Sequence, residues 1–153
     1  MRVCIGGTFN ILHKGHKLLI DKAFGTAGIR GSVFIGITTG ENSSGKKDVK
    51  PMIERKTSIE QYLSKKGFID RATIGPIEDK YGPSVKEEFD AIVVSPETVN
   101  TAKELNKKRK RLKKKPLKIV QIPFVLAEDN VPISSSRIKK REIDEHGNVL
   151  KRD

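Results

Sequence analysis

Residues 2–16 read RVCIGGTFNILHKGH, and this stretch decides the fold. A short apolar strand over Val3–Ile5 runs into a Gly-Gly-Thr turn, and His13 and His16 stand at the start of an amphipathic helix. Backbone amides at a helix start are unpaired donors at the positive end of the helix dipole, so they suit phosphate. Histidine adds a donor that is neutral or cationic near pH 7. The stretch therefore predicts a site for nucleotide phosphate chemistry.

The rest of the chain alternates apolar runs with helical patterns, which is typical of βαβ units and a parallel sheet. We expect further strands over 33–38, 72–77, 91–95 and 118–123. We expect helices that end at Gly28, run from Pro51 to Gly67, run from Pro96 to Pro116, and start at Ser134–Ser136 and continue through Ile143. The 153 residues predict a single α/β domain over 1–153, with a frayed tail over 147–153.

The formal net charge of +12 fits anionic partners such as nucleic acid, an anionic membrane surface or small phosphorylated ligands. The charge is uneven, because residues 103–118 hold ten Lys or Arg against the single acid Glu104. The basic segment 107–115 contains no aromatic residue and hence no stacking platform for single strands. We interpret it as a solvated face remote from the phosphate site, with nucleic-acid contact as the alternative.

The cellular setting is predicted from what the sequence lacks. No apolar run is long enough to span a bilayer, and the N-terminal residues do not resemble a secretory signal. The single cysteine, Cys4, excludes an internal disulfide and favours the reducing cytoplasm. We expect no membrane partner and no specific nucleic acid, and we favour a monomer.

A second polar cluster lies near the other end of the chain, at Ser134, Ser135, Ser136 and Arg137. A plain helix cap needs only one serine. Three hydroxyls and a planar cation at a helix start suit phosphate oxygens. In a doubly wound sheet, both clusters can converge at the carboxyl ends of the strands, at the switch point.

Two histidines three residues apart could instead be metal ligands. Such a site needs further ligands, and neither Cys4 nor His146 has suitable spacing. We therefore predict no metal-ligating set in the protein.

The segment 6–16 resembles the first motif of the (T/H)xGH nucleotidyltransferases, and 133–137 resembles their second motif, ISSxR. Segments 79–83 and 93–98 are similar to the DPYGP and VVSEET segments of one subgroup, the phosphopantetheine adenylyltransferases of archaeal and eukaryotic type. Residues 137–144 resemble that subgroup's C-terminal helix. The resemblance implies a Rossmann-like, doubly wound parallel sheet of about five strands with flanking helices. It also implies adenylyl transfer from ATP to 4′-phosphopantetheine, which gives dephospho-coenzyme A and pyrophosphate in coenzyme A biosynthesis.

The resemblance implies a role for each residue of the two motifs. His16 would steady the transition state, while His13 and Thr8 would contact the ATP phosphates and Gly7 and Phe9 would lie along the nucleotide. Ser134, Ser135, Ser136 and Arg137 would hold ATP from the other side.

Acceptor binding is where the chain departs from the family pattern. Asn10 replaces the usual aspartate, which speaks against a metal-linked role there, and no arginine stands near Ser95, where bacterial members carry one. The acceptor candidates are Thr8, Asn10, Lys46, Lys47 and Lys50. Lys50 is favoured and joins His13 and His16 in the catalytic set, because it precedes Pro51-Met52 as in the bacterial KKPM segment.

The residue types also predict a mechanism. The acceptor phosphate is already ionised, so the reaction needs fixed donors, cations and in-line positioning more than a strong base. Mg²⁺ is expected as cofactor, neutralising phosphate oxygens with few protein ligands. Two alternatives stay open: a small cytidylyl- or adenylyltransferase acting on glycerol phosphate or flavin mononucleotide, and a basic RNA-binding module that uses 107–115.

Overall fold

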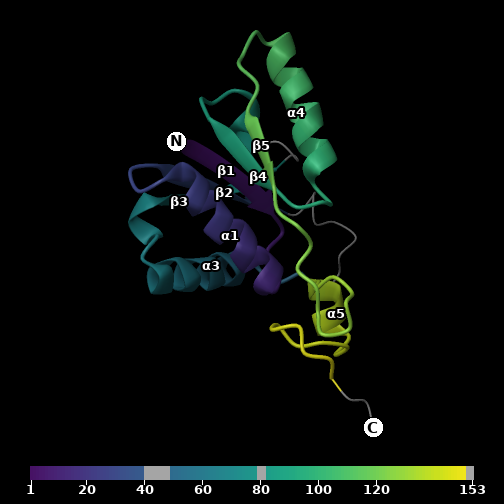
Figure 1. The fold of residues 1–153 in the computed structure, drawn as a ribbon. Coiled ribbons are helices and arrows are strands. Elements are labelled where there is room, and N and C mark those ends of the chain that lie inside the picture. The colour runs from purple at the N-terminus through teal and green to yellow at the C-terminus, as the bar shows by residue number, and fades with distance from the viewer. Residues whose placement is uncertain (40–48, 79–81, 151–153) are drawn as a thin grey trace.

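One parallel sheet organises the computed structural model, which describes residues 1–39, 49–78 and 82–150. Within those residues the sheet has five strands in the order β3-β2-β1-β4-β5 (Figure 1). The strands are β1 (Arg2–Gly7), β2 (Ser32–Thr38), β3 (Ala72–Ile77), β4 (Ala91–Val94) and β5 (Lys118–Gln121). All neighbouring pairs are parallel. This confirms the predicted Rossmann-like, doubly wound α/β fold.

The strand order reverses at β1, whose two neighbours are β2 on one side and β4 on the other. The chain winds outward from β1 to β3, returns to β4 and continues to β5. Successive connections therefore leave β1 and β4 toward opposite faces, and a crevice opens at their carboxyl ends. This switch point is where the sequence placed the phosphate site.

Alternate side chains of each strand enter two separate apolar layers, as the two-residue period of a strand requires. Val3 and Ile5 pack against helices α1 (Lys14–Ala27) and α3 (Met52–Lys66) on one face. Cys4 faces the other layer, where Leu105 of helix α4 (Val99–Arg111) covers it. Helices on both faces explain why the strands read as continuous apolar runs.

Glycines end α1 and α3 where the sequence predicts. Gly28 follows α1 with a φ of 83°, and Gly67 follows α3 with a φ of 76°. Residues with a side chain rarely adopt such angles, so glycine at these positions stops each helix cleanly. The short 3-10 helix η1 (Ile69–Arg71) then leads from α3 into β3.

Helix α4 is shorter than predicted at both ends. It begins at Val99, because residues 95–98 form a turn in which the Ser95 amide donates to Thr98 Oγ1 at 3.1 Å, so Pro96 lies outside the helix. It ends at Arg111, well before Pro116, and Lys113 has a φ of 58°. Leu112, expected on the apolar face, is 51% exposed as a result.

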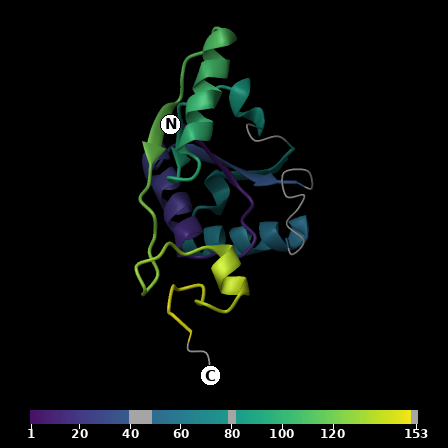
Figure 2. The same ribbon diagram turned by 90° about the vertical axis from the view of Figure 1, so that its right-hand side faces the viewer.

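The C-terminal segment forms a small unit beyond the sheet, visible as the yellow end of the chain (Figure 2). Helix α5 (Ser135–Lys139) is only five residues long. Ile143, expected on that helix, lies after it and is fully buried with Ala127 and Ile133. The end expected to fray from Gly147 is hydrogen-bonded as far as it is described: the Val149 amide donates to Glu128 Oε2 at 2.9 Å.

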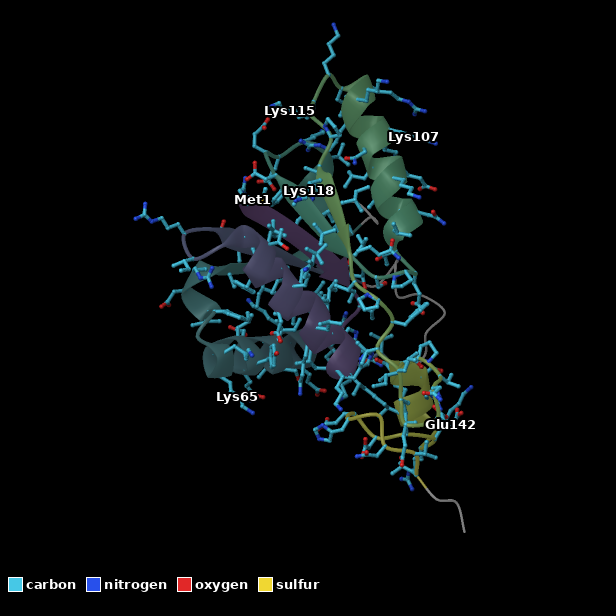
Figure 3. All side chains as sticks on the ribbon, in the orientation of Figure 1. Met1, Lys65, Lys107, Lys115, Lys118 and Glu142 are labelled. Carbon is cyan, nitrogen blue, oxygen red and sulfur yellow. The ribbon has the colours of Figure 1, made fainter. Side chains whose placement is uncertain are left out.

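The basic segment lies far from this C-terminal unit. Lys107 and Lys115 stand at the end of the molecule opposite Glu142 (Figure 3). Most of its cations are exposed, as predicted, but Arg109 is fully buried. Its guanidinium donates to the backbone carbonyls of Lys115 (2.8 Å), Ser84 (2.8 Å) and Glu87 (2.9 Å). Arg109 thus joins α4 to the 3-10 helix η2 (Gly82–Val85) and to the residues after it.

Among the described residues, no helix combines the length and the apolar composition needed to cross a membrane.

The buried guanidinium makes Arg109 a stability determinant. We expect Arg109→Met to lower the free energy of unfolding by about 3 kcal/mol or more, because it leaves buried carbonyls without donors. Urea titration followed by circular dichroism measures this. The exposed neighbour Lys107 supplies the control, since Lys107→Met should change stability by less than about 0.5 kcal/mol. Equal effects of the two substitutions would contradict the role given to Arg109.

Candidate active site

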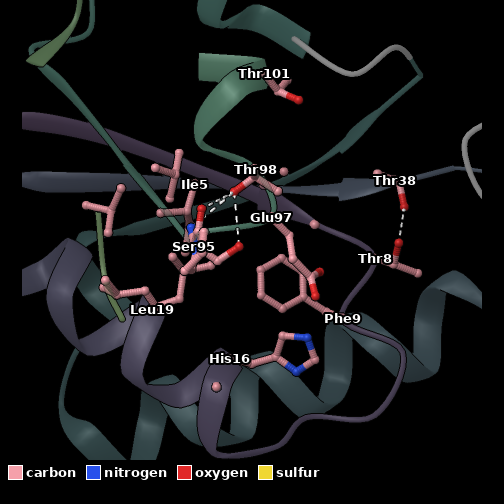
Figure 4. A pocket seen from close by; sticks show the side chains of 18 of the residues that line it. Ile5, Thr8, Phe9, His16, Leu19, Thr38, Ser95, Glu97, Thr98 and Thr101 are labelled. Atoms are coloured by element: carbon pink, nitrogen blue, oxygen red, sulfur yellow. Dashed lines mark hydrogen bonds between the residues drawn. The ribbon is translucent and has the colours of Figure 1, made fainter. Parts of the chain in front are cut away.

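A cavity of about 960 Å³ opens at the carboxyl ends of β1 and β4 (Figure 4). Its lining includes most of the residues that the two sequence motifs single out: Gly7, Thr8, Phe9, Asn10, His13, His16, Ser134, Ser135 and Ser136. On α4 the lining stops at Leu105, so the cationic end of that helix lies outside the cavity, as predicted.

Two histidine side chains cap the start of α1. His13 is the N-cap residue, and its Nδ1 accepts from the Gly15 amide at 3.0 Å. The His13 amide in turn donates to His16 Nδ1 at 3.3 Å. The Nδ1 atom of each ring therefore acts as a hydrogen-bond acceptor, and Nε2 carries the proton when the ring is neutral. The cap fixes which nitrogen of each histidine can donate to a ligand.

Both histidines are held in the neutral form at pH 7. Burial lowers the pKa of His13 to about 4. Burial, reinforced by the charge of His13, lowers the pKa of His16 to about 3, although a hydrogen bond with the Ile11 backbone acts in the other direction. The two rings stack with centroids 3.8 Å apart. Two neutral imidazoles, rather than two imidazolium cations, thus line the cavity.

Phe9 fixes the turn between β1 and α1. Its backbone has a φ of 50°, an uncommon value for a residue with a side chain, and its side chain is 1% exposed. The ring centroid lies 5.1 Å from that of His16. A Cβ on Gly7 would lie 3.3 Å from the Phe9 ring, so the packing of this ring favours glycine at the turn.

The two sequence clusters meet through Ser135. Its Oγ accepts from the Ile11 amide at 3.3 Å and donates to the Ile11 carbonyl at the same distance. Ser134 caps α5, since its Oγ accepts from the Arg137 amide at 3.2 Å. The convergence that the sequence predicts is confirmed, and one serine joins the two halves.

Arg137 differs from expectation because it does not line the cavity. Its guanidinium pairs with Asp129, lies 3.8 Å from a Glu142 oxygen and donates to the Val131 and Pro132 carbonyls, each at 3.2 Å. Lys139, two residues further along α5, lines the cavity instead. Sequence reasoning missed this lysine, although it belongs to the same motif segment.

Asn10 and Lys50 contact each other through the Lys50 backbone. The Lys50 amide donates to Asn10 Oδ1 at 2.7 Å, while the Lys50 side chain is not part of the cavity lining. Lys50 is therefore placed at the edge of the site, not inside it. The other two acceptor candidates, Lys46 and Lys47, lie outside the described residues.

The turn between β4 and α4 supplies further polar groups that the sequence analysis did not assign. Ser95, Glu97 and Thr98 of this turn line the cavity, as does Thr101 in the first turn of α4, and Glu97 extends toward Phe9 and His16 (Figure 4). The sequence did contain a signal for these residues, the similarity of 93–98 to a subgroup motif. That similarity was used only to indicate the family and not to assign site residues. Glu97 is the only carboxylate within the described lining.

One part of the cavity is apolar. Cys4, Phe34, Ile77, Ile92 and Leu105 line it, on the face of the sheet that α4 covers. Burial raises the pKa of the Cys4 thiol to about 12, so the thiol stays protonated and acts as an apolar wall. The cavity thus combines a polar end that suits phosphates with an apolar part that suits an uncharged chain.

The described residues contain no group of three or more His, Cys, Asp or Glu side chains arranged to hold a metal ion. The donor set near the histidines is instead amides, hydroxyls and imidazole N–H groups, which suits anions.

A switch-point cavity with a capped helix start and a serine cluster defines a nucleotide-binding protein of the doubly wound α/β class. Residues 4–141 match the cytidylyltransferase-like family model. The chain belongs to that family.

Relatives narrow the family further. A protein from Methanosarcina mazei named phosphopantetheine adenylyltransferase is 43% identical over 151 residues, which cover 98% of this chain and 97% of the relative. One from Methanopyrus kandleri with the same name is 46% identical over 147 residues, covering 94% of this chain and 91% of the relative. A crystal structure of a protein of unknown function from Archaeoglobus fulgidus superposes with a TM-score of 0.72 at 36% identity, covering 80% of this chain and 89% of that one.

The lowered histidine pKa values predict that acid destabilises the fold. Unfolded histidines take up protons below about pH 6.5, whereas the folded His13 and His16 resist protonation until about pH 4 and pH 3. Stability present at pH 7 is therefore lost as the pH falls through 6.5, by about 1 kcal/mol per histidine per pH unit. Unfolding free energies at pH 7, 6 and 5 measure this slope.

Two variants locate the origin of that pH dependence. His13→Asn should roughly halve the slope, because one of the two resisting groups is gone. The exposed His146 is the control, and His146→Gln should leave the slope unchanged. A slope unaffected by His13→Asn would show that the histidine cap is not its cause.

Proposed function

We propose that the protein transfers the adenylyl group of ATP to 4′-phosphopantetheine, producing dephospho-coenzyme A and pyrophosphate. The observation that carries the proposal is one cavity in which a histidine-capped helix start, a serine cluster and an apolar wall meet. The names of the relatives at 43% and 46% identity support the same reaction.

The chemistry follows from the donors in the polar end. A phosphate oxygen of the acceptor attacks the α-phosphorus of ATP in line, and the bond to pyrophosphate breaks. Negative charge grows on the α-phosphoryl oxygens and on the leaving pyrophosphate. His16 offers a neutral Nε2–H donor whose direction the cap has set in advance, and His13 and Thr8 add donors beside it. Such preorganised donors favour the transition state because they need no reorientation during transfer.

We expect Mg²⁺ as the cofactor, which would supply charge neutralisation on the phosphate oxygens of ATP. The donor set fits an ion held mainly by phosphate oxygens and water, since Glu97 is the only carboxylate within the described lining.

The apolar part of the cavity favours a long acceptor over a short one. Glycerol phosphate has no extended uncharged chain that could cover Cys4, Phe34 and Leu105. The pantetheine arm has such a chain, and burying apolar surface stabilises its complex. Lys50 stands at the edge of the site, where its side chain could approach the acceptor phosphate. We place this reaction in the cytoplasm and assign it to a monomer.

An acceptor panel tests the proposed reaction. Purified protein, ATP and Mg²⁺ are mixed in turn with 4′-phosphopantetheine, glycerol phosphate and flavin mononucleotide, and pyrophosphate release is followed. CTP replaces ATP in a parallel series. Transfer from ATP to 4′-phosphopantetheine alone is the expected result, and transfer only to another acceptor would refute the proposal.

His16 should matter for turnover more than for ATP affinity. We expect His16→Ala to lower kcat by a factor that corresponds to about 2.7–4 kcal/mol, typical of removing one donor to developing charge. Steady-state kinetics for both substrates separate kcat from KM. A near-normal kcat with a raised KM for ATP would contradict the transition-state role.

Lys139 and Arg137 should have unequal effects on ATP binding. Lys139→Ala removes a cation from the cavity lining, so we expect the Kd for ATP to rise about tenfold or more. Arg137→Ala breaks the contacts with Asp129 and Glu142, so its main effect should be lower stability. Calorimetric titration with ATP and thermal unfolding of both variants distinguish the two roles. A larger loss of affinity in the Arg137 variant would show that this arginine turns toward ATP on binding.

A further inference from the structure

Arg55 is a buried arginine beneath the turn that follows β1. It lies in the first turn of α3, and 4% of its surface is exposed. Its Nη1 donates to the carbonyls of Thr8 (3.0 Å) and Thr38 (2.9 Å), and its Nε donates to the Lys50 carbonyl (2.8 Å). Arg55 thus ties together the ends of β1 and β2 and the residue before Pro51.

The positive charge of Arg55 has no negative partner in the described part of the chain. All three hydrogen-bond acceptors are neutral carbonyls, and none of the ion pairs of the described residues includes Arg55. Burial lowers the pKa of the guanidinium, and no carboxylate offsets this effect. A guanidinium nevertheless stays protonated in proteins. Buried charges are normally paired, but among the described residues Arg55, like Arg109, has only neutral carbonyl partners.

Two of the residues that Arg55 holds line the cavity. Thr8 and Thr38 are both in the lining, and their hydroxyls are hydrogen-bonded to each other at 3.1 Å. The donation to the Thr8 carbonyl also polarises the peptide unit that contains the Phe9 N–H, because carbonyl and amide share one dipole. The positive charge of Arg55 therefore lies directly behind Thr8 and Thr38, two residues of the cavity lining.

We propose that a phosphate group of the bound substrate acts as a counter-ion to Arg55, which makes Arg55 a positioning residue that acts through Thr8. It does not line the cavity. It fixes the Thr8 turn and supplies positive potential that selects phosphorylated ligands. The inference rests on the proposed function for the identity of those ligands, ATP and 4′-phosphopantetheine.

Comparing ligands that differ only in phosphate separates this role from a merely structural one. The affinities of ATP and adenosine, and of 4′-phosphopantetheine and pantetheine, are measured by calorimetric titration for wild type, Arg55→Lys and Arg55→Met. A charge within about 7 Å of a phosphate, at the screening typical of a protein surface, changes affinity by about tenfold to a hundredfold. We expect Arg55→Met to weaken the phosphorylated ligands by that factor and their phosphate-free counterparts by less than about twofold.

Arg55→Lys keeps the charge and loses the planar fork. It should recover most of the affinity for ATP and so keeps the inference testable if the methionine variant fails to fold. Arg71→Met is the control, since Arg71 also donates to a backbone carbonyl, that of Gly28 at 2.6 Å, but Gly28, unlike Thr8 and Thr38, does not line the cavity. It should leave both affinity ratios unchanged.

The outcomes distinguish this inference from the proposed function. Equal losses for phosphorylated and phosphate-free ligands would overturn the counter-ion role, whether or not wild type transfers the adenylyl group. A selective loss for ATP in a protein that shows no transfer to any acceptor would support the role of Arg55 and refute the proposed reaction.

Discussion

The interaction on which the site depends is the capping of α1 by imidazole nitrogens. The Nδ1 atoms of His13 and His16 each accept a hydrogen bond from a backbone amide of the helix start, and this leaves Nε2 as the donor of each ring. A serine cap would satisfy the same amides but would offer no second nitrogen. Because the rings also lie in a buried stack, they remain neutral, and their donors point where the packing sets them. The same two hydrogen bonds therefore start helix α1 and set which nitrogen of each histidine is the donor.

The sheet order brings this helix start to its partners. Since β4 lies beside β1, the turn after β4 faces the turn after β1, and Glu97 comes close to Phe9. The C-terminal unit then closes the cavity from a third side through Ser135. Two buried arginines hold the surrounding backbone by hydrogen bonds to carbonyls. Arg55 binds the ends of β1 and β2, and Arg109 binds η2. The lining is thus held by backbone contacts more than by contacts among the lining side chains.

The sequence predicted the sheet and its glycine-terminated helices because apolar periodicity and glycine positions are local signals. It also predicted that the two motifs converge, which follows from the doubly wound topology. It could not assign Arg55 and Arg109 to the interior, because a cation in a charged run looks like solvated surface until the carbonyls that bind it are brought near by the fold. The predicted helix start at Pro96 is wrong, because the Thr98 hydroxyl accepts a hydrogen bond from the Ser95 amide and holds residues 95–98 in a turn before the helix.

A similar cause explains why Lys139 lines the cavity where Arg137 was expected. Residues two apart on a helix are about 200° apart around its axis, so only one of them can face the cavity. The sequence shows two cations in one motif, but it does not show which side of the helix will lie against Asp129. The pairing of Arg137 with Asp129 settles that choice, and it depends on how the chain between β5 and α5 folds back on itself.

The hydrogen bonds of Ser135 to Ile11 join residues 124 positions apart, and they have a consequence for how the protein is made. A ribosome releases β1 and the histidine cap early and the serine cluster last. When β1 and the histidine cap leave the ribosome, the third wall of the cavity has not yet been synthesised. A ligand that contacts all three walls can therefore bind only after the chain has been synthesised as far as α5, when all five strands have already been made.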